Sequence, residues 1–190
     1  KAPHEVGWFQ PRPETSLQLI AGSGLGPGEA LIDVGGGASL LVDHLLEAGW
    51  SDVSVLDISP AALYAARQRL GEPAAKVHWL VEDVTRFEPV RRYGVWHDRA
   101  VFHFLTDPVE RDAYVKVATE WIKPGGCLIV AAFGPQGPER CSGLPVVKYG
   151  PGELAAVFSG GFKPAELVEE IHRTPGGVSQ QFIYCRFVRR

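Results

Sequence analysis

Three carboxylates and one glycine-rich turn are the residues of this sequence whose types and spacing fit the binding of a small ligand. The turn is Gly35-Gly36-Gly37, and Asp33 lies two residues before it. Asp57 and Asp83 end two later apolar runs. Glycines allow a sharp turn and a close approach of ligand to backbone, and a helix that begins behind them offers free N–H groups. Carboxylates and backbone amides would then face one ligand.

The spacing of the acids indicates what this ligand contains. Asp57 comes 22 residues after Gly35, which fits a carboxylate that binds a ribose diol at the switch point of a parallel sheet. Asp83 can accept a hydrogen bond from an adenine amino group. The alternative is that all three acids are solvated or capping carboxylates at strand ends. We expect an adenosine cofactor.

Two residues narrow the choice among adenosine cofactors. The dinucleotide pattern G-x-G-x-x-G/A requires Gly or Ala at position 40, where this chain has Leu40. Asp33 would repel a pyrophosphate, but it can orient a cationic amino-acid group. Both features disfavour NAD and favour S-adenosylmethionine (SAM), which carries an ammonium group and no phosphate.

Alternating strand and helix patterns must position these residues. A short helix is expected at about 14–21, and apolar runs predict strands at 30–35, 53–57, 77–83, 93–98 and 126–133. Two final strands, 165–172 and 181–188, have no helix between them and must be antiparallel. The pattern predicts an α/β protein with a seven-stranded, mostly parallel sheet, one antiparallel terminal strand, and helices on both faces.

The helix starts and the longest loop have their own signals. Ser59-Pro60 and Asp107-Pro108 are typical helix starts, and Pro124-Gly125 is the expected end of the second of these helices. Residues 134–152 are rich in Gly and Pro and predict a long loop, followed by a short helix at 153–158. The i+4 spacing predicts that the inner face of the helix after Asp107 is formed by Val109, Ala113, Val117 and Trp121 with Tyr114 and Ala118 beside them.

The ordered motifs LIDVGGGAS, VLDIS, VEDV and WHDRAVFHF resemble those of the class I SAM-dependent methyltransferases over nearly the whole chain. Trp8-Phe9-Gln10, the D-V-G-x-G turn and Asp98-Arg99 are similar to a small branch that includes protein-lysine methyltransferases related to the elongation-factor enzymes. The Trp-x-Asp-Arg run also resembles thiopurine methyltransferase. Ser39 stands where many members have a third glycine, a mild departure because serine is small and can cap a helix.

The resemblance implies a Rossmann-like fold and a set of SAM-binding residues. It implies that the glycine turn and Asp33 contact the methionine end, that Asp57 and Ile58 hold the ribose and adenine, and that later residues complete the site. The full set that it implies as cofactor-binding is Trp8, Asp33, Gly35, Gly36, Gly37, Asp57, Ile58, Asp83, Val84, Arg99 and Ala100. Arg99 and Ala100 would lie beside the sulfonium.

The domain organisation is expected to be simple. We predict one domain over 1–190, with a Rossmann-like core at 29–190 and an N-terminal lid and helix at 1–28. Trp8 and Phe9 are expected to cover the cofactor. The alternative is that these aromatics are a hydrophobic staple for the first helix.

Methyl transfer is in-line displacement at an activated sulfonium, so no universal catalytic residue can be sought. His103 lies five residues past Asp98 and is the candidate general base, because histidine takes a proton near neutral pH. The alternative is a buried histidine bonded to backbone. The run His97-Asp98-Arg99-Ala100 replaces the Asn/Asp-Pro-Pro-Tyr/Phe run of enzymes that methylate nucleic-acid bases or glutamine, which argues against that branch.

Composition and net charge limit the classes of partner that we expect for this protein. The 190 residues carry a net charge of −3, which does not indicate a nucleic-acid partner, and no apolar run is long enough to span a membrane. Three sparse cysteines, Cys127, Cys141 and Cys185, indicate free thiols and a cytoplasmic location. No C-x-x-C occurs and His97 and His103 lack metal-ligand spacing, so no metal site is expected. We expect a monomer or a weak homo-oligomer.

The leading hypothesis is a SAM-dependent methyltransferase with a small-molecule acceptor that presents an N, O or S nucleophile, and S-adenosylhomocysteine (SAH) as product. One alternative is a protein-lysine methyltransferase with an acidic, aromatic channel formed by Trp96, Phe102, Phe104 and Asp98. Another is a non-catalytic SAM-binding partner subunit. A nicotinamide oxidoreductase is disfavoured by Leu40 and Asp33.

Overall fold

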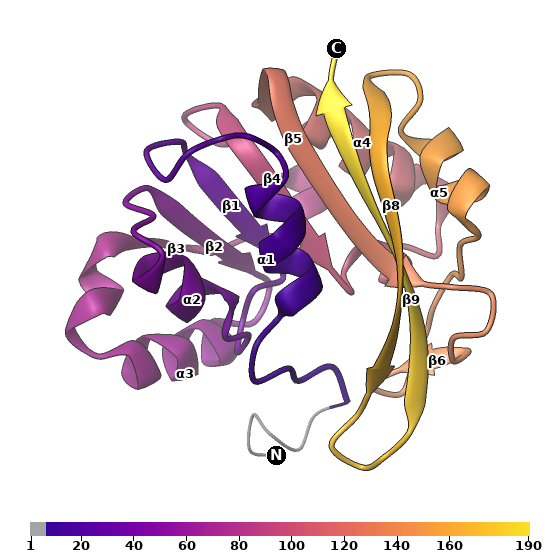
Figure 1. The fold of residues 1–190 in the computed structure, drawn as a ribbon, viewed down its shortest axis with the longest axis horizontal. Coiled ribbons are helices and arrows are strands. Elements are labelled where there is room, and N and C mark those ends of the chain that lie inside the picture. The colour runs from indigo at the N-terminus through magenta and orange to yellow at the C-terminus, as the bar shows by residue number, and fades with distance from the viewer. Residues whose placement is uncertain (1–6) are drawn as a thin grey trace.

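The computed structural model describes residues 7–190 (Figure 1). One seven-stranded sheet has the strand order β3-β2-β1-β4-β5-β9-β8. The first six residues of the expected 1–28 segment lie outside the described part. The strands of this sheet are β1 (Leu31–Val34), β2 (Val53–Asp57), β3 (Val77–Val81), β4 (Tyr93–Arg99), β5 (Ile122–Phe133), β8 (Phe162–Arg173) and β9 (Ser179–Arg189).

The predicted fold class is confirmed. Strands β3, β2, β1, β4 and β5 pair in parallel, whereas β9 pairs antiparallel with both β5 and β8. The single reversed strand is thus the last one in the chain, and it lies between β5 and β8 rather than at the sheet edge. The short turn that joins β8 to β9 accounts for their antiparallel pairing.

Helices cover both faces of the sheet (Figure 1). One apolar cluster joins the sheet to α1 (Glu14–Ala21), α2 (Leu41–Glu47) and α3 (Pro60–Leu70). A second cluster joins the opposite face to α4 (Pro108–Trp121) and α5 (Pro151–Val157). Each face therefore has its own core, and the loops at the strand ends stay free to form a site.

The predicted helix starts are confirmed at Ser59 and Asp107, whose side chains accept from the N–H groups of Ala62 and Val109. The predicted inner face of α4 is partly wrong. Val109 is 73% exposed, whereas Tyr114 and Ala118 are fully buried. The i+4 row drifts around a helix of 3.6 residues per turn, so a stripe that starts at Val109 leaves the sheet.

Two other boundaries differ from the predictions. The strand β5 begins at Ile122, directly after α4, so Pro124 and Gly125 lie within the strand and do not end the helix. The expected loop 134–152 contains a small hairpin of β6 (Arg140–Cys141) and β7 (Leu144–Pro145). Strands of two residues, such as β6 and β7, are too short to show a periodic hydrophobic pattern in the sequence.

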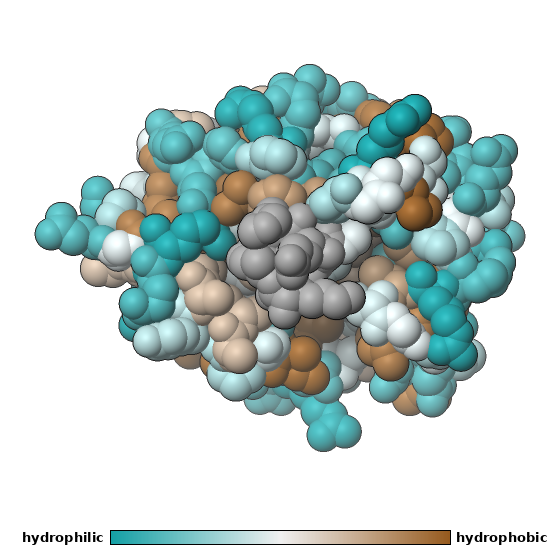
Figure 2. All heavy atoms as spheres, turned by 90° about the horizontal axis from the view of Figure 1, so that it is seen from below, coloured by the Kyte–Doolittle hydropathy of each residue, from teal (hydrophilic) through white to brown (hydrophobic). Residues whose placement is uncertain are grey.

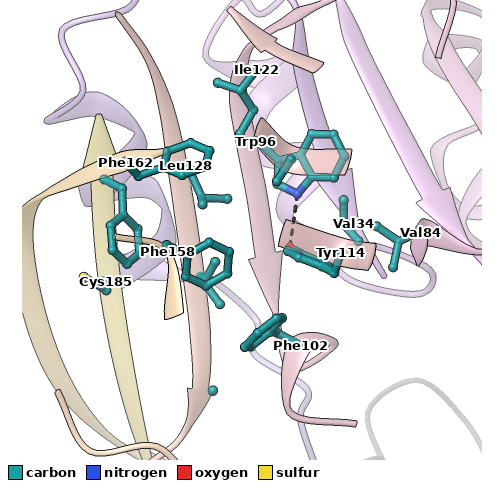
Figure 3. Packing of buried hydrophobic residues seen from close by; sticks show 14 of the residues in the cluster. Val34, Val84, Trp96, Phe102, Tyr114, Ile122, Leu128, Phe158, Phe162 and Cys185 are labelled. Atoms are coloured by element: carbon teal, nitrogen blue, oxygen red, sulfur yellow. Dashed lines mark hydrogen bonds between the residues drawn. The ribbon is translucent and has the colours of Figure 1, made fainter. Parts of the chain in front are cut away.

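Alternation along β4 decides which side chains reach which core. Trp96 lies among the aromatic side chains on the α4 face, where its Nε1 donates to the Tyr114 hydroxyl at 3.1 Å (Figure 3). His97 contacts α1 on the opposite face. Asp98 lies on the α4 face again, where it contacts Tyr114. Arg99 lies on the same face as His97, where it contacts Trp8. Successive residues of a strand point to opposite faces, so these four residues divide between the two cores.

Candidate functional site

A cavity of about 430 Å³ opens where β1, β2, β3 and β4 end, a size typical of small-ligand pockets. It lies where the strand order reverses between β1 and β4, the position at which ligands bind open α/β sheets. Figure 2 views the molecule from this end. The part of the chain described by the structure lines the cavity with Trp8, Gln10, Pro13, Ser16, Asp33, Val34, Gly35, Gly36, Ala38, Ser39, Leu41, Leu56, Asp57, Ile58, Ala62, Glu82, Asp83, Val84, His97, Arg99, Ala100, Val101, Phe104, Leu105, Cys141, Ser142 and Leu144.

The glycine turn connects β1 to α2 and has no room for side chains. A Cβ on Gly35 would lie 2.0 Å from Val101 Cγ2, and Gly35 also has a φ of +69°. A Cβ on Gly36 would lie 2.5 Å from Asp33 Oδ2. The turn therefore passes directly over the Asp33 carboxylate, and only glycine allows this approach. Gly37 is not among the residues that line the cavity; it lies against Asp57 Oδ2 instead.

Asp33 is 2% exposed and belongs to a buried polar chain. The register of β1 and β4 pairs Asp33 with His97. His97 Nδ1 lies 2.7 Å from Asp33 Oδ1, and His97 Nε2 lies 2.8 Å from the hydroxyl of Ser16 on α1. Asp33 Oδ2 is buried without a hydrogen-bond partner in the described residues. A buried carboxylate oxygen is costly to leave unpaired, so this atom is suited to accept from a ligand.

Asp57 and Asp83 end neighbouring strands and line the same cavity. The Ser59 N–H donates to Asp57 Oδ1 at 2.8 Å, and burial raises the pKa of the Asp57 carboxyl above its usual range. Asp83 Oδ1 accepts from both the N–H and the hydroxyl of Thr85. One oxygen of each carboxylate is thus engaged by the following turn, which holds the side chain in position. Two other predicted residues, Ile58 and Val84, also line the cavity.

Arg99 and Trp8 meet at the side of the cavity nearest the N-terminal segment. Arg99 Nη1 donates to the Trp8 carbonyl at 3.0 Å, and Arg99 Nε donates to the Tyr184 hydroxyl at 2.8 Å. The guanidinium also lies 4.4 Å from the centre of the Phe182 ring. Arg99 therefore anchors residues 8–13 beside the cavity. The following residue, Ala100, also lines it, with a strained φ of +70°.

His103 is not among the cavity-lining residues. Its side chain is fully buried next to Phe104 and Phe133, and its Nδ1 accepts from the Phe133 N–H at 3.3 Å. Burial, with a smaller contribution from the nearby Arg99 charge, lowers the pKa of His103 to about 3. The structure thus places the predicted general base behind the cavity wall, in the backbone-bonded arrangement that was its alternative.

The acidic, aromatic channel expected for the lysine-specific alternative is not formed. Trp96, Phe102 and Asp98 are fully buried, and of the four expected residues only Phe104 lines the cavity. Asp98 Oδ1 accepts from the N–H groups of Val101 and Phe102. The channel named in that alternative does not form because alternation along β4 directs Trp96 and Asp98 into the α4 core.

Comparison with known proteins gives the family. The sequence profile of a family described as "Methyltransferase domain" matches residues 32–128, which contain β2, β3 and β4, all of β1 except Leu31, and the acids Asp33, Asp57 and Asp83. The chain belongs to this family. The family-level resemblance predicted from the motifs is confirmed.

Relatives support the same assignment. The chain is 26% identical over 105 residues to "Malonyl-[acyl-carrier protein] O-methyltransferase 1" of Ilyobacter polytropus; the match covers 55% of this chain and 38% of that protein. This methyltransferase domain thus matches well under half the length of that curated relative.

Solved structures share the fold. The N-methyltransferase NodS from Bradyrhizobium japonicum WM9 has a TM-score of 0.75 at 18% identity, covering 93% of this chain and 94% of that one. The Burkholderia thailandensis 1,6-didemethyltoxoflavin-N1-methyltransferase, solved with 1,6-didemethyltoxoflavin and S-adenosylhomocysteine, has a TM-score of 0.71 at 21% identity, covering 92% and 76%.

Several residues that line the cavity of the methyltransferase domain were not predicted from the sequence. Ser16 lies outside the motifs, and His97 lies within WHDRAVFHF without an assigned role, although the even spacing of His97 and Arg99 on one strand could have placed both on one face. Cys141 also lines the cavity. The neighbouring residues Ser142 and Leu144 come from the unpredicted β6–β7 hairpin.

Other groups of this domain lie apart from the cavity. Cys127 and Cys185 are buried on β5 and β9, and burial raises the pKa of each thiol to about 12. Across residues 7–190 no group of three or more His, Cys, Asp or Glu side chains is arranged to hold a metal ion. Within the same residues no helix is both long and apolar enough to cross a membrane.

Proposed function

We propose that this methyltransferase domain transfers a methyl group from SAM to a small-molecule acceptor, leaving SAH. The observation that carries the proposal is the convergence of Asp33, Asp57 and Asp83 on one cavity beneath a glycine turn. The solved toxoflavin methyltransferase, which shares the fold, holds S-adenosylhomocysteine together with its acceptor. SAM, when bound, supplies a methyl group on an electrophilic sulfonium.

The residues of the cavity fit this cofactor. Asp33 Oδ2 lacks a partner among residues 7–190 and suits a cationic ammonium group. Asp57 keeps one oxygen for a ribose diol, because Ser59 engages only Oδ1. Asp83 and Val84 suit the adenine edge, and Ile58, 73% exposed, suits contact with the adenine face at the cavity mouth. Gly35 and Gly36 leave room for the methionine end.

The chain's contribution to the reaction is alignment and exclusion of water. The N-terminal residues Trp8 and Pro13 and the β6–β7 hairpin enclose the side opposite Asp57 and Asp83. There the acceptor's lone pair would form a bond to the methyl carbon as the carbon–sulfur bond breaks, its electron pair passing to sulfur. An N–H, O–H or S–H acceptor satisfies this balance when its proton passes to water as the new bond forms.

A small-molecule acceptor is favoured over a protein lysine. Trp96, Phe102 and Asp98, which the channel expected for a lysine would require, are buried and do not line the cavity. The side chains on the N-terminal and hairpin side are mostly apolar, including Trp8, Phe104 and Leu144. The free thiols of Cys127, Cys141 and Cys185 support a reducing, cytoplasmic location.

The test is calorimetric titration with SAM, SAH and NAD side by side. Micromolar binding of SAM or SAH with no NAD signal supports the proposal, and an NAD signal without SAM or SAH binding overturns it in favour of a nicotinamide enzyme. A panel of candidate acceptors is then tested for turnover, which is measured by the release of SAH. SAM binding without turnover on any acceptor would favour the non-catalytic subunit.

A matched pair of variants tests the assignment of Asp57. Asp57→Ala is expected to weaken SAM binding by about 1–3 kcal/mol through the loss of a charge-assisted contact. Asp112→Ala makes the same charge change at an exposed position of α4 and is expected to leave binding unchanged. Equal affinities for the two variants would remove Asp57 from the site.

A further inference from the structure

A hydrogen-bonded chain of three buried residues connects α1 to the turn that covers Asp33. Ser16 is 0% exposed and both His97 and Asp33 are 2% exposed. All three line the cavity. They come from three separate elements, α1, β4 and β1, so the chain exists only when α1 is docked on the sheet.

The proton positions in this chain follow from the chemistry of its members. An ionised Asp33 carboxylate can only accept, so His97 donates to it from Nδ1 over 2.7 Å. In the neutral imidazole Nε2 then has a lone pair, which accepts from the Ser16 hydroxyl over 2.8 Å. A Ser16 hydroxyl that donates to Nε2 favours the same tautomer, the one in which Nδ1 donates to Asp33 Oδ1. This donation leaves Asp33 Oδ2 as the free acceptor.

The same helix follows the segment that encloses the cavity. Trp8, Gln10 and Pro13 line the cavity immediately before α1. Several contacts hold this segment: Arg99 binds the Trp8 carbonyl, Gln10 donates to Glu170 at 2.9 Å, and His44 Nε2 lies 3.1 Å from the Pro11 carbonyl oxygen. Docking of α1 and placement of this segment are thus parts of one arrangement.

We propose that His97 is a positioning residue that couples recognition of the ammonium group at Asp33 to docking of α1 through Ser16. The inference rests on the proposed SAM-binding function and assigns roles to two residues, Ser16 and His97, to which the motifs assigned none. Coupling between two sites is reciprocal. The methionine end of the cofactor therefore stabilises docked α1, and docked α1 strengthens binding of that end.

The experiment compares two ligands that differ at the methionine end. SAH carries the amino-acid group, and 5′-deoxy-5′-methylthioadenosine keeps the adenosine and sulfur but lacks it. Ser16→Ala is expected to lower SAH affinity about tenfold and to change methylthioadenosine affinity less than about twofold. In hydrogen exchange, SAH is expected to protect the α1 amides in the wild type, and this protection is lost in Ser16→Ala.

A second variant tests the path of the coupling. His97→Asn keeps a donor near the Nδ1 position for Asp33 but is too short to reach Ser16. It is expected to match Ser16→Ala, and the double variant is expected to be no weaker than either single one, because both remove the same contact. Gln18→Ala is the control on α1, since exposed Gln18 donates only to Glu14, and it is expected to bind both ligands as the wild type does.

Three outcomes overturn the inference. Equal losses for both ligands in Ser16→Ala would mean that α1 acts only as a general cover. Unchanged affinities, or additive losses in the double variant, would mean that the chain is a packing feature. If the wild type binds neither ligand, the proposed function itself fails; wild-type binding with unaffected variants contradicts the coupling alone.

Discussion

The Tyr114 hydroxyl of α4 donates to Asp98 Oδ2 at the end of β4, over 2.7 Å, in the centre of one core. Asp98 Oδ1 accepts from the backbone N–H groups of Val101 and Phe102, so this carboxylate shapes the turn that carries Ala100 and Val101 into the cavity wall. Asp98 thus supports the site from behind without lining it.

Removing the Tyr114 hydroxyl is expected to destabilise the fold. Tyr114→Phe leaves Asp98 Oδ2 and Trp96 Nε1 without their partner, which is expected to lower the free energy of unfolding by about 1–3 kcal/mol. Urea unfolding measures the change. The matched control is Tyr149→Phe, because the buried Tyr149 hydroxyl has no partner in the described residues and its removal is expected to be neutral or stabilising. Equal losses in the two variants would contradict the role of Tyr114.

Asp98 is expected to give stability an unusual pH dependence. Burial is the largest cause of a pKa raised to about 6, whereas an unfolded Asp titrates near ~3.9. Between these values the folded state binds more protons, so the free energy of unfolding falls as pH rises from about 4 to about 6, by on the order of 2 kcal/mol. Asp98→Asn is expected to remove this fall. If unfolding midpoints of Asp98→Asn and wild type show the same slope, the buried carboxyl is not its source.

His103 is expected to act in the opposite direction. Burial lowers its pKa to about 3, below the unfolded value of ~6.5. The unfolded state then binds more protons between pH 3 and 6.5, so stability is complete above about pH 6.5 and is lost as pH falls through this window, by up to ~1.4 kcal/mol per pH unit. His103→Phe, which suits a pocket beside Phe104 and Phe133, is expected to flatten this loss. If His103→Phe remains as acid-sensitive as the wild type, His103 is not the source of the stability loss at low pH.

His103→Phe also tests catalysis. Because the ring lies outside the cavity lining, SAM affinity and turnover at pH 7 are expected to change little once the variant is folded. A loss of turnover by ~10²-fold at unchanged SAM affinity would instead restore His103 as a general base.

Gly36→Ala is expected to damage the site through Asp33. The added Cβ would lie 2.5 Å from Asp33 Oδ2 and 2.7 Å from Val55 Cγ1. Asp33 cannot move away cheaply because His97 holds it, so we expect ~1–3 kcal/mol of destabilisation and weaker SAM binding. The control Gly28→Ala adds a methyl into open space without a positive φ. Thermal unfolding measures the destabilisation, and calorimetric titration measures SAM binding. Equal results for Gly36→Ala and Gly28→Ala would contradict the close approach of Gly36 to Asp33.

Local patterns in the sequence determined the elements and the ends at which the acids lie. Apolar runs and Ser-Pro or Asp-Pro helix starts report backbone geometry over a few residues, so β2 was predicted at its observed bounds and α3 and α4 at their observed starts. Asp33, Asp57 and Asp83 were placed at one edge because parallel strands share a direction. The family-level function followed from the same motifs.

Tertiary structure alone decided which polar residues face the cavity. His97, Asp98 and His103 lie within seven residues, yet one joins the cavity, one enters the α4 core and one is buried behind Phe133. Alternation along β4 places His97 and Asp98 on opposite faces of the sheet. Which of these faces lines the cavity depends on where α1 and α4 pack. Ser16 and the β6–β7 hairpin reach the site only through such long-range contacts, which no local sequence pattern encodes.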